Sequence, residues 1–430
     1  MQVMRYLRER KGCLSLGLMI FLVTLIPYLM GFVLEGGTRK FSGFVFGVED
    51  GNSYIAKMLL GANGDWLFRT PYTNIDQAGI LAFFPYLLLG KLISGPGQHE
   101  QLIALFQFFR LVGIGLYSLA AYDFLRLFTS NQNLIRWGVI ITLVGGGVGW
   151  LSLFGLRGSG YNRLPIDLYS PETFGFLSIF GLPHLAISRA LLTWGWVFLF
   201  TENQAINSPV KNGLLVGSLW MLMGFFQPLS VVTAWAGMGG AWIIHYLSTV
   251  IKLRKFIFPW NSNDLMNELK KAALAIIVSG FWVIYNLISI INDSFLAGWS
   301  SQNIIRSPAI PDYLLGFSLI LIPAIIGARK ILNRAPSIGY FSIGYVLIFP
   351  LLAYFPINLQ RRLPDGIWWV LTGLAIVGLE AISYRWRFRF QLIASVGILT
   401  SVFLFIGGIF SVQAISEPVY IAAQKVQAFE

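Results

Sequence analysis

The chain has 430 residues, of which 56% are hydrophobic and only 12% are charged, and its formal net charge at pH 7 is +12. Soluble proteins carry about a quarter charged residues, so this composition excludes a soluble enzyme and a soluble DNA-binding protein. The one cysteine, Cys13, excludes an internal disulfide and a cysteine-rich metal site. The composition is typical of a membrane protein.

The apolar residues are grouped in blocks of about 17 to 25 residues, the length that a helix needs to cross about 30 Å of hydrocarbon. They predict an all-α polytopic membrane protein with about eleven transmembrane helices, rather than a β-barrel of short alternating segments. Basic residues precede the first block, which is too long for a signal peptide and lacks its cleavage site, so we expect it to be retained. The expected spans are 13–34, 102–127, 134–156, 184–201, 212–228, 229–250, 270–291, 311–328, 337–355, 366–384 and 389–411.

A further apolar stretch, 79–95, decides the topology. If it stays at the outer interface, most of the 31 basic residues but few of the 19 acidic residues lie on the cytoplasmic side, as the positive-inside rule requires. We therefore expect an integral protein of the cell (inner) membrane with a cytoplasmic N-terminus and an extracytoplasmic C-terminus. The basic balance then reflects orientation and contact with the anionic lipid bilayer, and no nucleic-acid partner is expected.

This topology makes residues 1–430 a single integral membrane domain with two long extracytoplasmic loops. Loop 35–101 is rich in aromatic and turn residues, so we expect it to fold on the membrane surface with short interfacial helices. The second long loop is 157–183. On the cytoplasmic face, segment 252–271 has the pattern of an amphipathic interfacial helix, with Asn263 as its possible N-cap.

The first outer loop contains two adjacent acids, Glu49 and Asp50. A short interfacial helix is expected from Asn52 to Leu60, with Asn52 or Ser53 as N-cap and the acids beside the positive end of its dipole. Neighbouring carboxylates raise one pKa of the pair, which suits proton abstraction, and they can also bind a cation. The alternative is a solvated turn that only complements the helix dipole.

The second outer loop offers Asp167 and Glu172, and His184 lies at the outer start of the next span. A single histidine in apolar surroundings is usually a hydrogen-bonded packing residue, and substrate contact is the alternative. Arg110 and Arg189 lie just inside spans, where an arginine needs a partner or an anion. Taken alone, each is expected to reach the outer interface with its long side chain.

Arg361 and Arg362 are adjacent in the outer loop 356–365, at the level of the lipid headgroups. The planar guanidinium matches phosphate oxygens, so the pair favours binding of a lipid-linked phosphate, with anchoring to ordinary phospholipids as the alternative. The glycines at 145–149 precede no Lys-Ser or Lys-Thr and fall within the expected span 134–156. They indicate close helix packing rather than a phosphate loop.

Taken together, these features resemble the GT-C class of membrane glycosyltransferases, which includes the protein O-mannosyltransferases and the aminoarabinose transferases of lipid A. The strings EDGNSYIAKM, GDWLFRTPYT, GGGVGW, PETF, LPH and NLQRRLPDG are more closely similar to bacterial GT-C-like membrane proteins of undefined substrate. The resemblance implies transfer of a sugar from a polyprenyl-phosphate donor to an acceptor hydroxyl on the outer face. The acceptor itself is unknown.

The resemblance also implies roles for particular residues. The catalytic base is Asp50 or Glu49, and Asp50 is preferred because its shorter chain is held more rigidly. The leaving lipid phosphate needs cationic stabilisation, and the substrate-binding residues that the resemblance implies are Arg361, Arg362, Arg69, His184, Asp167, Glu172, Trp66, Tyr72 and Tyr54. No cofactor is expected; the second outer loop has no Asp-x-Asp, and dependence on a divalent metal stays open.

Two other functions remain as alternatives at this stage. The many spans also suit a secondary transporter, although ion-coupled carriers usually place ionisable residues near the membrane midplane, and these spans have almost none. A scaffold protein that binds a lipid-linked sugar without turnover is the other alternative, and the acid pair argues against it.

Overall fold

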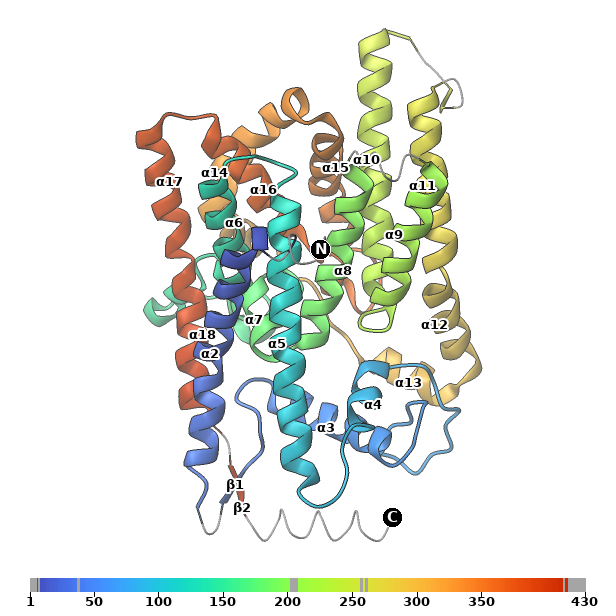
Figure 1. The fold of residues 1–430 in the computed structure, drawn as a ribbon, viewed down its shortest axis with the longest axis vertical. Helices are drawn as coiled ribbons and strands as arrows, with labels where there is room; N and C mark the ends of the chain where they lie inside the picture. Colours follow the sequence, from blue (N-terminus) through green and yellow to red (C-terminus); the bar gives the residue numbers. More distant parts are fainter. Residues whose placement is uncertain are drawn as a thin grey trace.

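The computed structural model describes residue 6 and residues 8–36, 39–201, 208–255, 258–259, 262–412 and 414–416. Within these ranges the protein is a helical bundle, and its only sheet is a two-stranded antiparallel one (Figure 1). Strand β1 (Arg39–Phe41) pairs with β2 (Ala414–Ser416), and Lys40 lies opposite Ile415. This sheet brings the start of the loop that precedes α3 beside the end of α18.

The long helices of the bundle follow the expected spans. They are α2 (Lys11–Val33), α5 (Gln98–Leu125), α6 (Gln132–Val144), α8 (Pro183–Phe200), α9 (Pro209–Gly224), α10 (Leu229–Leu253), α11 (Asn263–Ser279), α12 (Phe281–Asn292), α14 (Ile310–Arg334), α15 (Pro336–Ala353), α16 (Ile367–Glu380), α17 (Tyr384–Val396) and α18 (Ile398–Phe410). Four further helices lie outside the expected spans: α3 (Val48–Ala62), α4 (Phe84–Gly90), α7 (Gly175–Gly181) and α13 (Ser294–Gln302). Short 3-10 helices occupy Gly149–Phe154, Tyr161–Arg163, Ile166–Leu168 and Gln360–Arg362.

Seven helical segments among the described residues are long and apolar enough to cross a membrane. They include α2, α5, α14, α15 and three composite segments formed by α11 with α12, by residues 360–380, and by α17 with α18. The protein is therefore an all-α integral membrane protein, as the composition predicts. The spans expected at 134–156, 184–201, 212–228 and 229–250 contain α6, α8, α9 and α10, which are shorter or less apolar, so a total of eleven crossings stays a prediction.

Helix α16 is the central helix of the bundle, because nearly all of its residues are buried. It touches α14 almost backbone to backbone: a Cβ atom added to Gly327 would lie 1.8 Å from the Leu374 carbonyl oxygen, and one added to Gly378 would lie 1.9 Å from that of Pro323. Small residues allow helices in a bilayer to approach in this way. The segment that leads into α16, residues 360–366, is thereby fixed at the centre of one end of the bundle.

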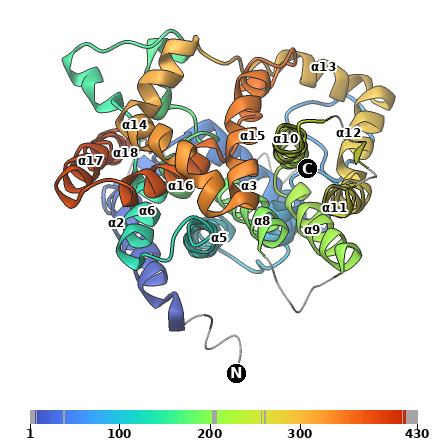
Figure 2. The same ribbon diagram turned by 90° about the horizontal axis from the view of Figure 1, so that it is seen from above.

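That end of the bundle also holds α3, α4 and α13, whereas the last turns of α10 and the first turns of α11 lie at the other end (Figure 1). Seen along the bundle, α3 lies across its centre (Figure 2). Helix α3 starts at Val48, earlier than expected, because Gly47 caps it in the left-handed conformation with φ of +57°. Glu49 and Asp50 therefore belong to its first turn, and Asn52 and Ser53 are not its N-cap.

Two further segments can be compared with the prediction: 79–95, which was expected not to cross the membrane, agrees with it, and 252–271 differs from it. In the stretch 79–95 the structure has only α4, whose seven residues rise about 10 Å, too little to cross a bilayer. The interfacial helix predicted for 252–271 is not separate, because α10 continues to Leu253 and α11 starts at Asn263. No glycine or proline interrupts 263–279, so its polar first turns join the apolar part that follows. Residues 256–257 and 260–261 lie outside the described ranges.

The glycine run packs closely against neighbouring helices, as predicted, but residues 145–148 are not themselves helical. Helix α6 ends at Val144, and the glycines that follow wrap around the carboxylate of Asp167. Asp167 Oδ2 accepts hydrogen bonds from the backbone N–H groups of Gly147 at 2.9 Å and Gly149 at 2.8 Å. A Cβ atom at Gly149 would lie 2.5 Å from Asp167 Oδ1. The glycines are needed both for the close approach of this carboxylate and for close helix packing, because a Cβ atom at Gly147 would lie 2.5 Å from the carbonyl oxygen of Gly316 on α14.

Candidate functional site

The candidate site lies where α3, α4, α8 and the segment before α16 meet. The exposed acids Glu49 and Asp50 stand in the first turn of α3, and the next turn carries Tyr54, which is buried. The Tyr54 ring stacks on that of Tyr86 with centroids 4.5 Å apart and meets the His184 ring edge to face at 5.3 Å. Three segments that are distant in sequence are thus held together by one aromatic cluster.

His184 is fixed in this cluster by a hydrogen bond. Its Nδ1 lies 2.8 Å from the hydroxyl of Tyr86 on α4. In the tautomer in which this hydroxyl donates to Nδ1, the ring proton is on Nε2, which is then a donor. The positive charges of Arg362 and Lys57 both interact electrostatically with the imidazole ring of His184. His184 is therefore a partnered ring in a positively charged surrounding.

Arg362 joins the cluster from the 3-10 helix before α16. Its Nε lies 3.3 Å from Glu172 Oε1, an ion-pair distance, and its side chain is 32% exposed. Within the described chain, Arg362 Nε and Glu172 Oε2 are buried and have no hydrogen-bond partner. Burial first, and then the charge of Asp50, raise the pKa of Tyr54, whereas Arg362 lowers that pKa. The charges of Asp50, Glu172 and Arg362 thus all act on one phenol.

Arg361 points to a different neighbour. Its guanidinium lies over the ring of Tyr169, 4.8 Å from the centroid. The charges of Arg361 and Asp312 both act on the Tyr169 hydroxyl. Although they are adjacent in sequence, Arg361 and Arg362 contact different residues. Of the two, only Arg362 pairs with Glu172 and belongs to the cluster of Tyr54 and His184.

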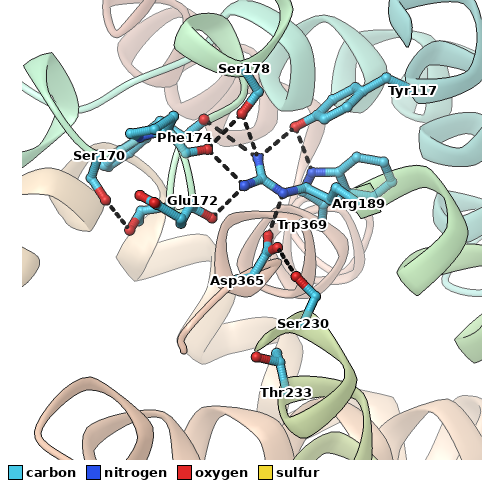
Figure 3. Close-up of polar contacts among 12 residues, drawn as sticks. Tyr117, Ser170, Glu172, Phe174, Ser178, Arg189, Ser230, Thr233, Asp365 and Trp369 are labelled. Atoms are coloured by element: carbon cyan, nitrogen blue, oxygen red, sulfur yellow. Dashed lines mark hydrogen bonds and ion pairs between the residues drawn. The ribbon is translucent and has the colours of Figure 1, made fainter. Parts of the chain in front are cut away.

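Glu172 and Arg362 are positioned by a buried ion pair between Arg189 and Asp365 (Figure 3). Arg189 Nε donates to Asp365 Oδ1 at 2.5 Å, and Asp365 Oδ2 accepts from the Ser230 hydroxyl at 3.1 Å. The Tyr345 hydroxyl donates to the Asp365 carbonyl oxygen. The pair thereby joins α8, α10, α15 and the start of α16.

Arg189 also holds the turn that carries Glu172. Its Nη2 donates to the carbonyl oxygens of Pro171 at 2.7 Å and Glu172 at 2.6 Å. A second arginine, Arg110, is likewise fully buried and donates to Thr24 Oγ1 at 2.8 Å. The expectation that Arg110 and Arg189 reach the outer interface was therefore wrong for both, because the bundle supplies each with buried acceptors.

Lys57 was not selected from the sequence, but it belongs to this region. It follows Asp50 by seven residues, so both lie on one face of α3. Its Nζ donates to Ser53 Oγ at 2.6 Å and lies 4.1 Å from the centre of the Phe83 ring. Burial lowers the pKa of Lys57 to about 8, and Asp50 opposes this shift. The spacing from Asp50 was the signal in the sequence that could have found Lys57.

The remaining predicted residues lie apart from this cluster. Asp167 is committed to the glycine segment, and burial raises its pKa against the effect of its hydrogen bonds. Arg69 Nε donates to the carbonyl oxygen of Gln77 at 3.2 Å, within its own loop. Trp66 is 60% exposed and lies under Lys91, and Tyr72 is 68% exposed and lines the neighbouring cleft that Lys57 also lines.

Two of the positions that complete the site gave little signal in the sequence. Tyr86 lies in the apolar stretch 79–95, and Asp365 follows a proline in a short loop. Asp365 is 176 residues from Arg189, so nothing in the local pattern connects them.

No group of three or more histidine, cysteine or acidic side chains placed to hold a metal ion occurs among the residues that the structure describes. Asp50, Glu172 and His184 offer oxygen and nitrogen ligands near Tyr54, but they do not form such a group. The sequence matches no known family model and no curated protein.

The ion pair yields a stability prediction. Asp365→Leu leaves the buried Arg189 guanidinium without its counter-ion, and loss of one partner of a buried pair typically costs about 3 to 5 kcal/mol. We expect a marked fall in the melting temperature of the detergent-solubilised protein. Adding Arg189→Met removes the stranded charge, so the double variant should melt at a higher temperature than Asp365→Leu alone. A double variant that is less stable than Asp365→Leu would contradict this account of the pair.

Proposed function

We propose that the protein is a GT-C-type glycosyltransferase that moves a sugar from a polyprenyl-phosphate donor to an acceptor hydroxyl on the extracytoplasmic face. The observation that carries this proposal is that the charges of the carboxylate Asp50 and the cation Arg362 both act on Tyr54, whose ring meets the imidazole of His184. These residues come from three separate segments that the resemblance to GT-C enzymes singles out. A base and a phosphate-binding cation at one end of a membrane bundle are what this transfer requires.

The proposed reaction needs a base at the acceptor. Asp50 accepts the proton of the acceptor hydroxyl while the oxygen attacks the anomeric carbon of the sugar. The bond between that carbon and the phosphate oxygen breaks, and the lipid monophosphate leaves with the electron pair. Asp50 is a better candidate than Glu49, because its charge acts on both Tyr54 and Lys57.

The leaving phosphate needs positive charge more than it needs a proton, since its second pKa is about 6. Arg362 supplies that charge beside Glu172, and its buried Nε has no hydrogen-bond partner in the described chain. In the tautomer with its proton on Nε2, His184 adds a neutral donor. Glu172 Oε2, also without a hydrogen-bond partner there, can accept from a sugar hydroxyl.

We further propose the orientation that this chemistry requires. Eleven helical segments cross the inner membrane, with a cytoplasmic N-terminus and an extracytoplasmic C-terminus. The basic ends of α5, α10 and α14 then face the cytoplasm, in agreement with the positive-inside rule. Helices α3, α4 and α13 at the opposite end face outward.

The base is tested by Asp50→Asn, with the exposed Asp76→Asn in the same loop as the matched control. Both substitutions remove one exposed charge, so both should leave folding nearly unchanged, within about half a kcal/mol. We expect a deletion strain to accumulate a polyprenyl-phosphate sugar and to lose an envelope glycan, as measured by mass spectrometry. Asp76→Asn should restore the wild-type profile, and Asp50→Asn should not.

The other outcomes of this experiment identify the alternatives. If folded Asp50→Asn restores the glycan, the protein supports the pathway without catalysis, as a binding scaffold would. If the deletion changes neither the lipid-linked sugars nor the glycans, while purified protein in liposomes moves a small solute across the bilayer, the transporter alternative is correct.

The phosphate site is tested by the two neighbouring arginines, because their contacts differ. Arg362→Gln should weaken binding of a polyprenyl-phosphate sugar to the purified protein by about 1.5 to 3 kcal/mol, the usual strength of a hydrogen bond to a charged group. Arg362→Lys keeps the charge but loses the two-point grip, so it should restore only part of the affinity. Arg361→Gln should have the smaller effect. Equal affinities for all three variants and the wild type would refute the assignment.

The orientation is tested by cysteine labelling in a Cys13→Ala background. The exposed positions Asn74 and Asn358 lie at the end with α3, and Asn333 is exposed near the opposite end of α14. Cysteines at Asn74 and Asn358 should react with a membrane-impermeant maleimide in intact spheroplasts, and one at Asn333 should react only after lysis. The reverse pattern would place the candidate site on the cytoplasmic face.

A further inference from the structure

A cleft of about 570 Å³ opens beside the candidate site, between α3, the loop segment 68–75 and α13. Both α13 and the first outer loop lie at the same end of the bundle (Figure 1). The ring of Trp299 on α13 lies 6.3 Å from those of Phe68 and Phe83, which joins the two sides. The cleft is therefore built by two segments that are more than 200 residues apart in the sequence.

Lys57 lies in the wall of this cleft and is only 6% exposed. Its ammonium group donates one hydrogen bond, to Ser53, and is otherwise faced by the rings of Phe83 and Tyr54 at 4.1 and 5.1 Å. No carboxylate of the described residues lies within 4.0 Å of its Nζ. A buried cation is costly unless an anion compensates it, so the cleft presents a cationic group that has no ion-pair partner among the described residues.

The rest of the lining suits a carbohydrate. Trp299, Phe68 and Tyr72 supply flat apolar surfaces, and Thr70 and Gln302 supply polar groups between them. Binding sites with aromatic walls and a few placed hydrogen-bonding groups fit ligands that have both apolar faces and hydroxyls. A sugar ring is such a ligand.

Helix α3 connects this cleft to the proposed base. Asp50, Ser53 and Lys57 follow each other at intervals of three and four residues, so they share one face of the helix. The rise from Asp50 to Lys57 is about 10 Å at 1.5 Å per residue. A ligand in the cleft can therefore present a hydroxyl to Asp50 while an anionic group about 10 Å away contacts Lys57.

We infer that this cleft binds the acceptor, and that the acceptor is an anionic saccharide whose carboxylate or phosphate pairs with Lys57. This inference rests on the proposed glycosyltransferase function and adds the substrate class to it. The two substrates then use different cations. Arg362 binds the phosphate of the donor, and Lys57 binds the carboxylate or phosphate of the acceptor.

The test is a direct binding measurement on the purified full-length protein in nanodiscs, without a donor. The probes are a tetrasaccharide of alternating glucuronic acid and N-acetylglucosamine, its carboxyl-reduced neutral form, and an oligomannoside with and without a terminal phosphate. At least one anionic probe should bind tenfold or more tightly than its neutral counterpart. The pair that shows this difference tells carboxylate from phosphate.

The variants assign the effect to Lys57. Lys57→Gln should remove the preference for the anionic probe, and Ser53→Asp should do the same by placing a carboxylate beside Lys57 while keeping the lysine. The matched control is Lys91→Gln, since Lys91 lies in the same loop over the ring of Trp66 and does not line the cleft. Lys91→Gln should bind all probes as the wild type does.

Equal binding of anionic and neutral probes, or an anionic preference that survives both Lys57→Gln and Ser53→Asp, would overturn the inference. Its failure is distinguishable from failure of the proposed function, because no turnover is measured. Loss of a glycan in the Asp50→Asn strain together with no anionic preference would leave the transferase and reject this acceptor. If the protein prefers anionic probes through Lys57 but its deletion changes no glycan, the transferase is rejected and the anionic saccharide site at Lys57 is kept.

Discussion

The buried ion pair between Arg189 and Asp365 is the interaction on which the candidate site depends. Two fully buried charges cost a large desolvation free energy, which is offset only when both are paired and hydrogen-bonded. Here Asp365, Ser230 and the carbonyl oxygens of Pro171 and Glu172 supply those partners. The same hydrogen bonds hold the turn that carries Glu172 and the segment that carries Arg362. The buried pair therefore determines the positions of both residues in the site.

The second constraint is the first turn of α3. Because Gly47 starts the helix two residues before Glu49, the spacing of the helix puts Asp50, Tyr54 and Lys57 on neighbouring turns of one face. Tyr54 then packs against Tyr86 and His184, and Lys57 faces the cleft below α13. One short helix therefore connects the proposed base, the proposed phosphate-binding cluster and the proposed acceptor cleft.

Much of this could be predicted from the sequence, and the reasons for the rest are physical. The lengths of the apolar blocks identify a helical membrane protein. The sequence also indicates four of the site residues, Asp50, Glu172, His184 and Arg362, but not their positions relative to one another. Pairing between distant buried charges, as in Arg189 with Asp365, leaves no local pattern. The glycines at 145–149 allow both close helix packing and the tight approach of a carboxylate, and only the packing was predicted, because both require the same small residue.

The central claim is that the cluster at Tyr54 binds the phosphate of a lipid-linked sugar. A cryo-electron microscopy structure of the Asp50→Asn variant with a polyprenyl-phosphate sugar tests it most directly, because the variant should retain the donor without turning it over. The account predicts phosphate density in contact with Arg362 and His184, and the anomeric carbon facing residue 50. Phosphate density at the opposite end of the bundle, beside Arg10 and Arg126, would contradict it.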